Sequence, residues 1–513
     1  MKKLTFVVFF LCAAMLYSCG NGAPVFYIDG ELPEIGEYSG KNSAGRFYDS
    51  YTPVFLPSDD YGTVIPFIGS NKIFRPSSEF EYGFSGQFRK MGFCTPDGRI
   101  VMDASGAYSD ISHHVSADGF EYYTLYSPPQ NAERFNGKTT VISADGSIIT
   151  ELPEGAVMCC VGEGKIVSVS WDYPNPGVWC HSYDGKLLFS FGESYGATGV
   201  FSHGMLAVSN YKDGTDRSWF VNEKGEKVLG DYEYCSGFTE EGIAVVREIG
   251  GKYCLINTSG DKLTDEYENL YITQGNYYCA QGEDFSQVLS PVGEVVCTIP
   301  SGRYFDFAVL EDGKTVYNDY SYKRCTDGSE IVCKENGYPA QNIVGNKYFV
   351  CKEEKAGEKY PGENAGAADK TGYLVDYDGN LIATLEDFDY ACALTSDGLL
   401  VYSSFGNYEN NDFKLTGYDI NKKEQTFCYN TSGYAYFLDE EERYLYVSLS
   451  DHASGQTEYA KLYDAEKGRF VLSDIRNLQF YKVHGKEYFA VATDALCTLY
   501  NENFEKIYQT LNE

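Results

Sequence analysis

Tryptophan, histidine and basic residues are scarce in this chain of 513 residues, which has 3 Trp, 6 His, and 41 Lys and Arg against 74 Asp and Glu. The formal net charge of −33 argues strongly against a nucleic-acid partner, because nucleic-acid-binding proteins need clustered positive charge. His113 and His114 form the one histidine cluster. Adjacent strand residues point to opposite faces, so we expect no metal site there.

Several catalytic and cofactor signatures are also missing. The sequence has no C-x-x-C pair and no D-x-D-x-D-G calcium loop, and GFSG at residues 83–86 lacks the spacing of a G-x-S-x-G elbow. The stretch NGKTT, residues 136–140, resembles the end of a phosphate loop, but position 132 is Ala where the loop has its first glycine. We therefore expect no cofactor and no catalytic residues.

Long apolar runs are absent apart from Leu4 to Leu16, which follows Lys2 and Lys3. The run is too short to span a bilayer comfortably, which takes ~20 residues. A positive start, a short apolar core and a small residue before the cut are typical of a secretory signal. We expect no transmembrane helix.

The four residues Leu16-Tyr17-Ser18-Cys19 close this segment and resemble the bacterial lipobox. The resemblance implies that Cys19 is acylated with diacylglycerol and becomes the new N-terminus. Residues 1–18 would then be a lipoprotein signal peptide and residues 19–45 a flexible tether, with the lipid as the only membrane anchor. The alternative is a plain secretory signal with an incidental cysteine.

Glycine and tyrosine are abundant, with 53 Gly and 46 Tyr, and they recur in a regular pattern. An apolar run, a polar turn with glycine and a second apolar run follow one another, as in TVISADGSIITEL. This pattern predicts β-hairpins, because glycine accepts a positive φ without steric cost. The turn glycines are Gly98, Gly146, Gly185, Gly225, Gly260, Gly293, Gly328, Gly379 and Gly468, and two weaker copies turn near Lys422 and Asn503.

These eleven turns are spaced by ~40 residues, and a second pair of predicted strands, such as YACALTSDGLLVYSS, separates them. Four short strands per repeat of about 40 residues are typical of a β-propeller blade. We therefore predict an all-β propeller over residues 46–513, as one large propeller or two in tandem. The polar stretch 352–372 is either a boundary between two propellers or a long loop inside one blade.

The middle of the chain resembles the WG-repeat family. Its unit has an aromatic residue, a Gly-Leu-Ala-x-Val segment, a Trp-Gly pair and a glycine turn. Over residues 200–270 the matching positions include Phe238, Gly242, Ala244, Val245 and Gly260, while Tyr253-Cys254 stands where the family has Trp-Gly. The resemblance implies an interaction scaffold without catalytic activity.

Of the sixteen cysteines, fourteen lie after the lipobox, mostly within apolar strands such as KYCLIN. There cysteine behaves as a small apolar residue, so we expect most of these thiols to be free and buried.

Three functions fit these features. The first is a non-catalytic binding or scaffold lipoprotein outside the cytoplasm, which recognises a protein, peptide or glycan through its propeller loops. The second is a propeller enzyme that acts on extracellular glycans. The third is an assembly factor that binds other exported proteins. Glycoside hydrolysis needs two facing carboxylates. The acidic clusters Asp59-Asp60, Glu240-Glu241 and Asp439 with Glu440 to Glu442 lie in predicted turns.

Overall fold

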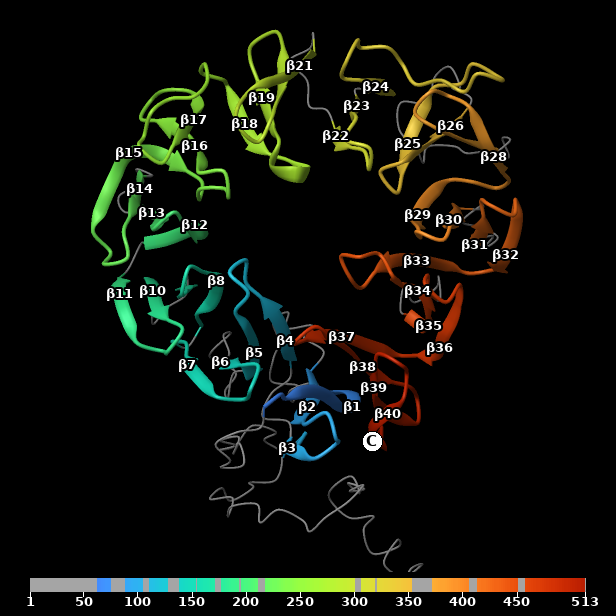
Figure 1. The fold of residues 1–513 in the computed structure, drawn as a ribbon, viewed down its shortest axis with the longest axis horizontal. Coiled ribbons are helices and arrows are strands. Elements are labelled where there is room, and N and C mark those ends of the chain that lie inside the picture. Colours follow the sequence, from blue (N-terminus) through green and yellow to red (C-terminus); the bar gives the residue numbers. More distant parts are fainter. Residues whose placement is uncertain are drawn as a thin grey trace, which may run out of the picture. The chain divides into compact units, whose positions relative to one another are not determined.

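The computed structural model describes residues 62–74, 88–104, 110–127, 138–153, 155–170, 177–192, 195–210, 217–299, 306–318, 321–352, 371–405, 413–450 and 457–512. These residues form β-strands throughout, and their one helical segment is the single 3₁₀ turn η2 (Gln274–Asn276). The strands make ten sheets in which consecutive strands pair, and seven of the ten have four strands (Figure 1). The predicted β-propeller fold is confirmed.

Two compact units divide the chain, and the first combines residues 1–201 and 223–225 with residues 475–513. Its four complete sheets are made of the following strands: β1 (Ile65–Phe74), β2 (Phe88–Cys94) and β3 (Ile100–Met102); β4 (Asp110–Val115), β5 (Glu121–Ser127), β6 (Lys138–Ser143) and β7 (Ile148–Glu151); β8 (Val157–Gly162), β9 (Lys165–Ser170), β10 (Gly177–Ser182) and β11 (Leu187–Phe191); and β37 (Asn477–Val483), β38 (Lys486–Ala492), β39 (Leu496–Asn501) and β40 (Lys506–Leu511).

The second unit holds most of the remaining strands. A six-stranded sheet consists of β12 (Tyr195–Ser202), β13 (Met205–Asn210), β14 (Arg217–Val221), β15 (Lys227–Cys235), β16 (Ile243–Glu248) and β17 (Tyr253–Asn257). The other sheets are β18 (Asn269–Ile272), β19 (Tyr278–Gln281), β20 (Ser286–Leu289) and β21 (Val295–Ile299); β22 (Asp306–Val309), β23 (Thr315–Asn318) and β24 (Tyr322–Arg324); β25 (Ala340–Val344), β26 (Tyr348–Cys351), β27 (Gly372–Val375) and β28 (Leu381–Leu385); β29 (Tyr390–Leu394), β30 (Leu399–Phe405), β31 (Phe413–Asp419) and β32 (Glu424–Tyr429); and β33 (Ser432–Phe437), β34 (Tyr444–Ser450), β35 (Thr457–Asp464) and β36 (Arg469–Ile475).

The predicted hairpins supply the last two strands of every four-stranded sheet. All nine turn glycines have a positive φ, from 61° at Gly468 to 92° at Gly146, as expected. In the two weaker copies the left-handed residues are Lys423 (φ 57°) and Phe504 (φ 61°). Eleven turns fit into ten sheets because the copies with Gly225 and Gly260 both belong to the six-stranded sheet β12–β17.

A side chain at the start of several hairpin turns helps to close the turn. Asn257 Oδ1 accepts the backbone N–H groups of Ser259 and Asp261, both at 2.9 Å. Asp376 and Asn501 accept the corresponding N–H groups of their own turns. Such Asx turns satisfy backbone donors that would otherwise have no partner, so the polar residue three positions before the glycine is part of the turn.

The polar stretch 352–372 joins two neighbouring strands of one sheet. Strand β26 before it pairs with β27 after it, with Phe349 opposite Val375 and Cys351 opposite Tyr373. The division of the chain into two compact units falls elsewhere, near residues 201 and 475. The strands on either side of the stretch therefore belong to one sheet.

The core lies between the faces of successive sheets, because the central strands are buried on both sides. In β30, Leu399 and Val401 pack toward β34, while Leu400 and Tyr402 pack toward β26 and β27. Residues that alternate along a strand point to opposite faces. The central strands thus contribute to two hydrophobic clusters at once, which explains their nearly continuous apolar runs.

The two ends of the described chain meet in the first unit (Figure 1). One hydrophobic cluster combines Phe67 and Phe93 from the first sheet with Tyr488 and Leu499 from the last sheet. The Tyr123 hydroxyl, on the second sheet, donates to the backbone oxygen of Val64 at 2.6 Å. This shared core ties the first, second and last sheets together.

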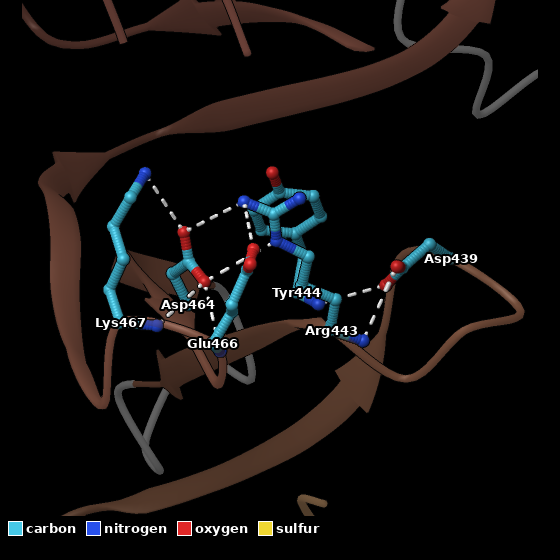
Figure 2. A network of polar contacts seen from close by, with 6 residues as sticks. All are labelled: Asp439, Arg443, Tyr444, Asp464, Glu466 and Lys467. Atoms are coloured by element: carbon cyan, nitrogen blue, oxygen red, sulfur yellow. Dashed lines mark hydrogen bonds and ion pairs between the residues drawn. The ribbon is translucent and has the colours of Figure 1, made fainter. Parts of the chain in front are cut away.

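A buried carboxylate organises the last turn of the sheet β33–β36 (Figure 2). Asp464 is fully buried and lies 3.4 Å from Arg443 Nε and 3.1 Å from Lys467 Nζ. Its Oδ1 also accepts the backbone N–H groups of Glu466 at 3.1 Å and Lys467 at 3.2 Å. Two cations and two backbone donors therefore compensate the burial of one negative charge.

Candidate functional site

A cleft lies on one face of the second sheet. Strands β4 and β5 pair antiparallel, which sets Asp110 opposite Tyr126, Ser112 opposite Thr124 and His114 opposite Tyr122. Because alternate residues share a face, these six side chains form one continuous floor. We call this feature the β4–β8 cleft; its volume is about 390 Å³ and its full lining is Asp110, Ser112, His114, Tyr122, Thr124, Tyr126, Thr139, Val157, Met158, Cys160 and Val161.

The wall of the β4–β8 cleft comes from the first strand of the next sheet. Val157, Met158, Cys160 and Val161 of β8 line it with apolar and sulfur-containing side chains. Val157 is 55% exposed although it is a β-branched apolar residue. The pairing of β8 with β9 has a bulge between Met158 and Cys160, and a bulge changes the direction in which neighbouring side chains point.

A row of stacked rings builds one end of the floor. His114 stacks on Tyr122 with 5.1 Å between ring centroids, and Tyr122 lies 5.7 Å from Phe120. Phe120 in turn stacks on Tyr183 at 3.7 Å, and the Tyr183 hydroxyl donates to Asp118 at 2.9 Å. These stacking contacts fix the orientation of the His114 ring in the ligand-free protein.

At pH 7, Asp110 is the one charged side chain among the described lining residues of the cleft. Burial lowers the pKa of His114, although Asp110 acts in the opposite direction, so the imidazole is neutral at pH 7. The ring nitrogen Nε2 lies 3.0 Å from Thr124 Oγ1. Burial also raises the pKa of Tyr122 to about 12, which keeps the phenol protonated. Among the lining residues that the structure describes, Asp110 is the only carboxylate, and none is a lysine or arginine.

His113 points away from the cleft, as expected for neighbours on a strand. Its Nε2 lies 3.8 Å from Glu121 Oε2, and His484 Nδ1 of the last sheet lies 3.2 Å from the same oxygen. Burial lowers the pKa of His113 to about 4. No group of three or more His, Cys, Asp or Glu side chains in the described ranges could hold a metal ion.

The remaining sequence predictions fall into three groups. Cys19 and Asp59-Asp60 lie outside the described residues. Glu240-Glu241 and Asp439 lie in turns, as predicted, and Asp439 accepts the backbone N–H of Tyr444 at 2.8 Å. All thirteen cysteines whose side chains are described are free, and ten of them are buried, which confirms the expectation of free buried thiols.

Sequence reasoning considered His114 only as a metal ligand and missed the other cleft residues. The signal was present in DISHHV and EYYTLYS, where polar or aromatic residues alternate with Ile111, Tyr123 and Leu125. Each of these three is buried in the core, so the alternate face carries the polar set. Two such polar faces on paired strands predict a polar surface, although the sequence does not show what stands opposite it.

Comparison with known proteins gives the fold alone. The sequence matches no family model and no curated protein. A crystal structure of a eukaryotic initiation factor is similar, with 11% identity, a TM-score of 0.38, and coverage of 71% of this chain and 94% of that chain. BamB from Moraxella catarrhalis is 9% identical, with a TM-score of 0.26 and coverage of 60% and 79%. AztD from Citrobacter koseri is 14% identical, with a TM-score of 0.26 and coverage of 66% and 91%.

The structure also bears on the expectation that no helix crosses a membrane. None of the described segments forms an apolar helix of membrane-spanning length. The proposed lipid attachment at Cys19 and the resemblance to WG repeats stay predictions.

Proposed function

We propose that this protein is a non-catalytic binding protein of the cell envelope, held to a membrane by a lipid on Cys19, and that it binds its ligand in the β4–β8 cleft. The observation that carries the binding role is the cleft itself. Hydroxyl groups, a neutral imidazole and a carboxylate share its floor, and β8 adds an apolar wall. Pockets that combine an apolar lining with a few convergent polar groups are typical ligand sites.

The residues of the cleft favour binding over glycan hydrolysis. Hydrolysis of a glycosidic bond uses two carboxyl groups, about 5 to 10 Å apart, on either side of the bond. The lining residues within the described ranges provide only Asp110. The described lining of the cleft therefore lacks the pair of carboxyl groups that a glycan-active propeller enzyme would need. We favour a binding role for this site over that alternative. The net charge of −33 again disfavours a nucleic-acid ligand.

Lipid attachment is tested by metabolic labelling with a fatty acid analogue in a bacterial host that processes lipoproteins. We expect label in the wild-type protein and none in Cys19→Ala, because the thiol is the acylation site that the LYSC segment implies. Cys12→Ala, which changes a cysteine inside the apolar run, serves as the control and should be labelled like the wild type. Unlabelled wild-type protein would remove the anchor from the proposal.

Binding in the cleft is tested by a ligand-observed NMR screen of a fragment library containing cations, anions and neutral compounds. Thr124→Trp places a large ring at the centre of the floor and should abolish the binding of most hits. Thr298→Trp, an exposed strand threonine outside the cleft, is the matched control and should keep them. If the hits bind equally to both variants, the cleft is not the ligand site.

A further inference from the structure

The electrostatics of the β4–β8 cleft point to one class of ligand. Asp110 is the only charged residue in the described part of its lining, and its cross-strand partner is Tyr126. The neutral His114 and the protonated Tyr122 add no compensating positive charge. Asp110 is exposed, and a ligand that covers it without supplying positive charge would desolvate its carboxylate at a cost in binding free energy.

The rest of the cleft suits a cation that also carries hydrocarbon. Val157 and Met158 offer apolar contact along the wall. A metal ion would need several oxygen or nitrogen ligands, which a single carboxylate does not provide. An ammonium group with methyl or methylene substituents is weakly hydrated, and aromatic rings attract it through their π faces. The net charge of −33 attracts cations to the surface as a whole.

An anionic ligand fits poorly for the same reasons. Anion sites use arginine, lysine or converging backbone N–H groups. None of the described lining residues is an arginine or lysine, and the carboxylate of Asp110 would repel an anion. A neutral sugar could form hydrogen bonds with the hydroxyls of Ser112 and Thr124, but it would leave Asp110 without a counter-charge. We therefore favour a cation over a neutral sugar as the ligand.

We propose that the β4–β8 cleft binds a compact organic cation, with its ammonium group at Asp110 and Tyr126 and its hydrocarbon part against Val157 and Met158. This inference rests on the proposed function, because it names the ligand class of the same site. The ammonium forms an ion pair with Asp110, and the hydroxyls of Ser112 and Thr124 lie between this end and the stacked rings.

Isothermal titration with choline and with its neutral isostere 3,3-dimethylbutanol tests the charge requirement. We expect choline to bind at least about tenfold more tightly, since the two probes have nearly the same shape and differ in charge. The affinity for choline should fall as NaCl is raised, because salt screens the pair with Asp110. Equal affinities for the two probes, or no binding of choline, would overturn the proposal.

Asp110→Asn should weaken choline binding about tenfold, toward the affinity of the neutral probe, while Asp110→Glu should keep part of it. Asp284→Asn, which removes an exposed carboxylate in a turn of another sheet, is the matched control and should leave the affinity unchanged. Circular dichroism checks that each variant is folded. Loss of binding in both Asp110→Asn and Asp284→Asn would mean that only the total charge matters, which contradicts the specific pair.

The location of the ligand site and the chemical class of its ligand can be tested separately. If the fragment hits occupy the cleft but are anionic or neutral, the organic-cation inference is wrong while the cleft remains the ligand site. If hits ignore Thr124→Trp, the proposed function loses its site, and the inference fails with it.

Discussion

Asp464→Ala is expected to lower the free energy of unfolding by about 3 kcal/mol, because it removes the buried carboxylate that two cations and two backbone N–H groups share. Arg443 and Lys467 would lose their shared partner, and two backbone N–H groups of the turn would lose their acceptor (Figure 2). Urea unfolding followed by circular dichroism measures the loss. The neighbouring carboxylate Glu466 contacts Arg443 at 2.8 Å, but its side chain is 69% exposed. Glu466→Ala should therefore change stability by less than about 1 kcal/mol.

The contribution of Asp464 should also depend on pH in a defined direction. Burial acts to raise the pKa of this carboxyl, but hydrogen bonds from Lys467 and Arg443 outweigh it and hold the pKa below its usual value. A group with a lowered folded-state pKa stabilises the fold above its unfolded pKa of about 4 and loses that effect as the pH falls through the folded-state pKa. The stability difference between wild type and Asp464→Ala should thus shrink below about pH 4. A difference that stays constant down to pH 2 would contradict the charged network.

Gly185→Ala is expected to destabilise the first unit far more than the same change at Gly119. Both glycines close a Ser-x-Asp-Gly turn, and both have a φ of +81°. A Cβ at Gly119 would meet nothing within 4 Å, whereas a Cβ at Gly185 would clash with the backbone oxygen of Ile149 in the preceding sheet. Gly119→Ala should therefore cost about 1 to 2 kcal/mol, from backbone strain alone. Gly185→Ala should cost a further 1 to 3 kcal/mol or so, because a backbone oxygen cannot move aside without disturbing the sheet.

The pair of glycine variants isolates the packing of one sheet on the next. Both proteins are compared by urea unfolding under the same conditions, and the quantity of interest is the difference between their losses. Equal losses would mean that the turn at Gly185 does not press on the preceding sheet, and that its glycine is needed for φ only.

The sequence predicted the repeat because the information for a hairpin is local. The turn glycines and the alternation of apolar residues are visible within a dozen residues, and all nine glycines have the expected φ. The number of sheets could not be predicted from the number of turns, because two turns belong to the one sheet β12–β17. The polar residue at the start of each turn, such as Asn257, was overlooked although it too is local.

The cleft could not be predicted in the same way, because it forms between strands of different sheets. The polar faces of β4 and β5 can be read from the alternation in their sequences, but the approach of Val157 and Met158 depends on how two sheets pack. The lowered pKa of His114 has a similar origin, since it follows from burial in the folded chain. Burial and inter-sheet contact are tertiary properties that a pattern of residue types does not contain.

Hydrogen–deuterium exchange of the wild-type protein, with and without the tightest-binding fragment of the NMR screen, tests most directly whether the ligand lies in the β4–β8 cleft. We expect slower exchange in the peptides that cover residues 110–115, 121–127 and 157–162, because a ligand on this floor restrains the strands that line it. Peptides from β18 to β32 should exchange unchanged. Protection confined to those other sheets, with none at β4, β5 or β8, would contradict the account.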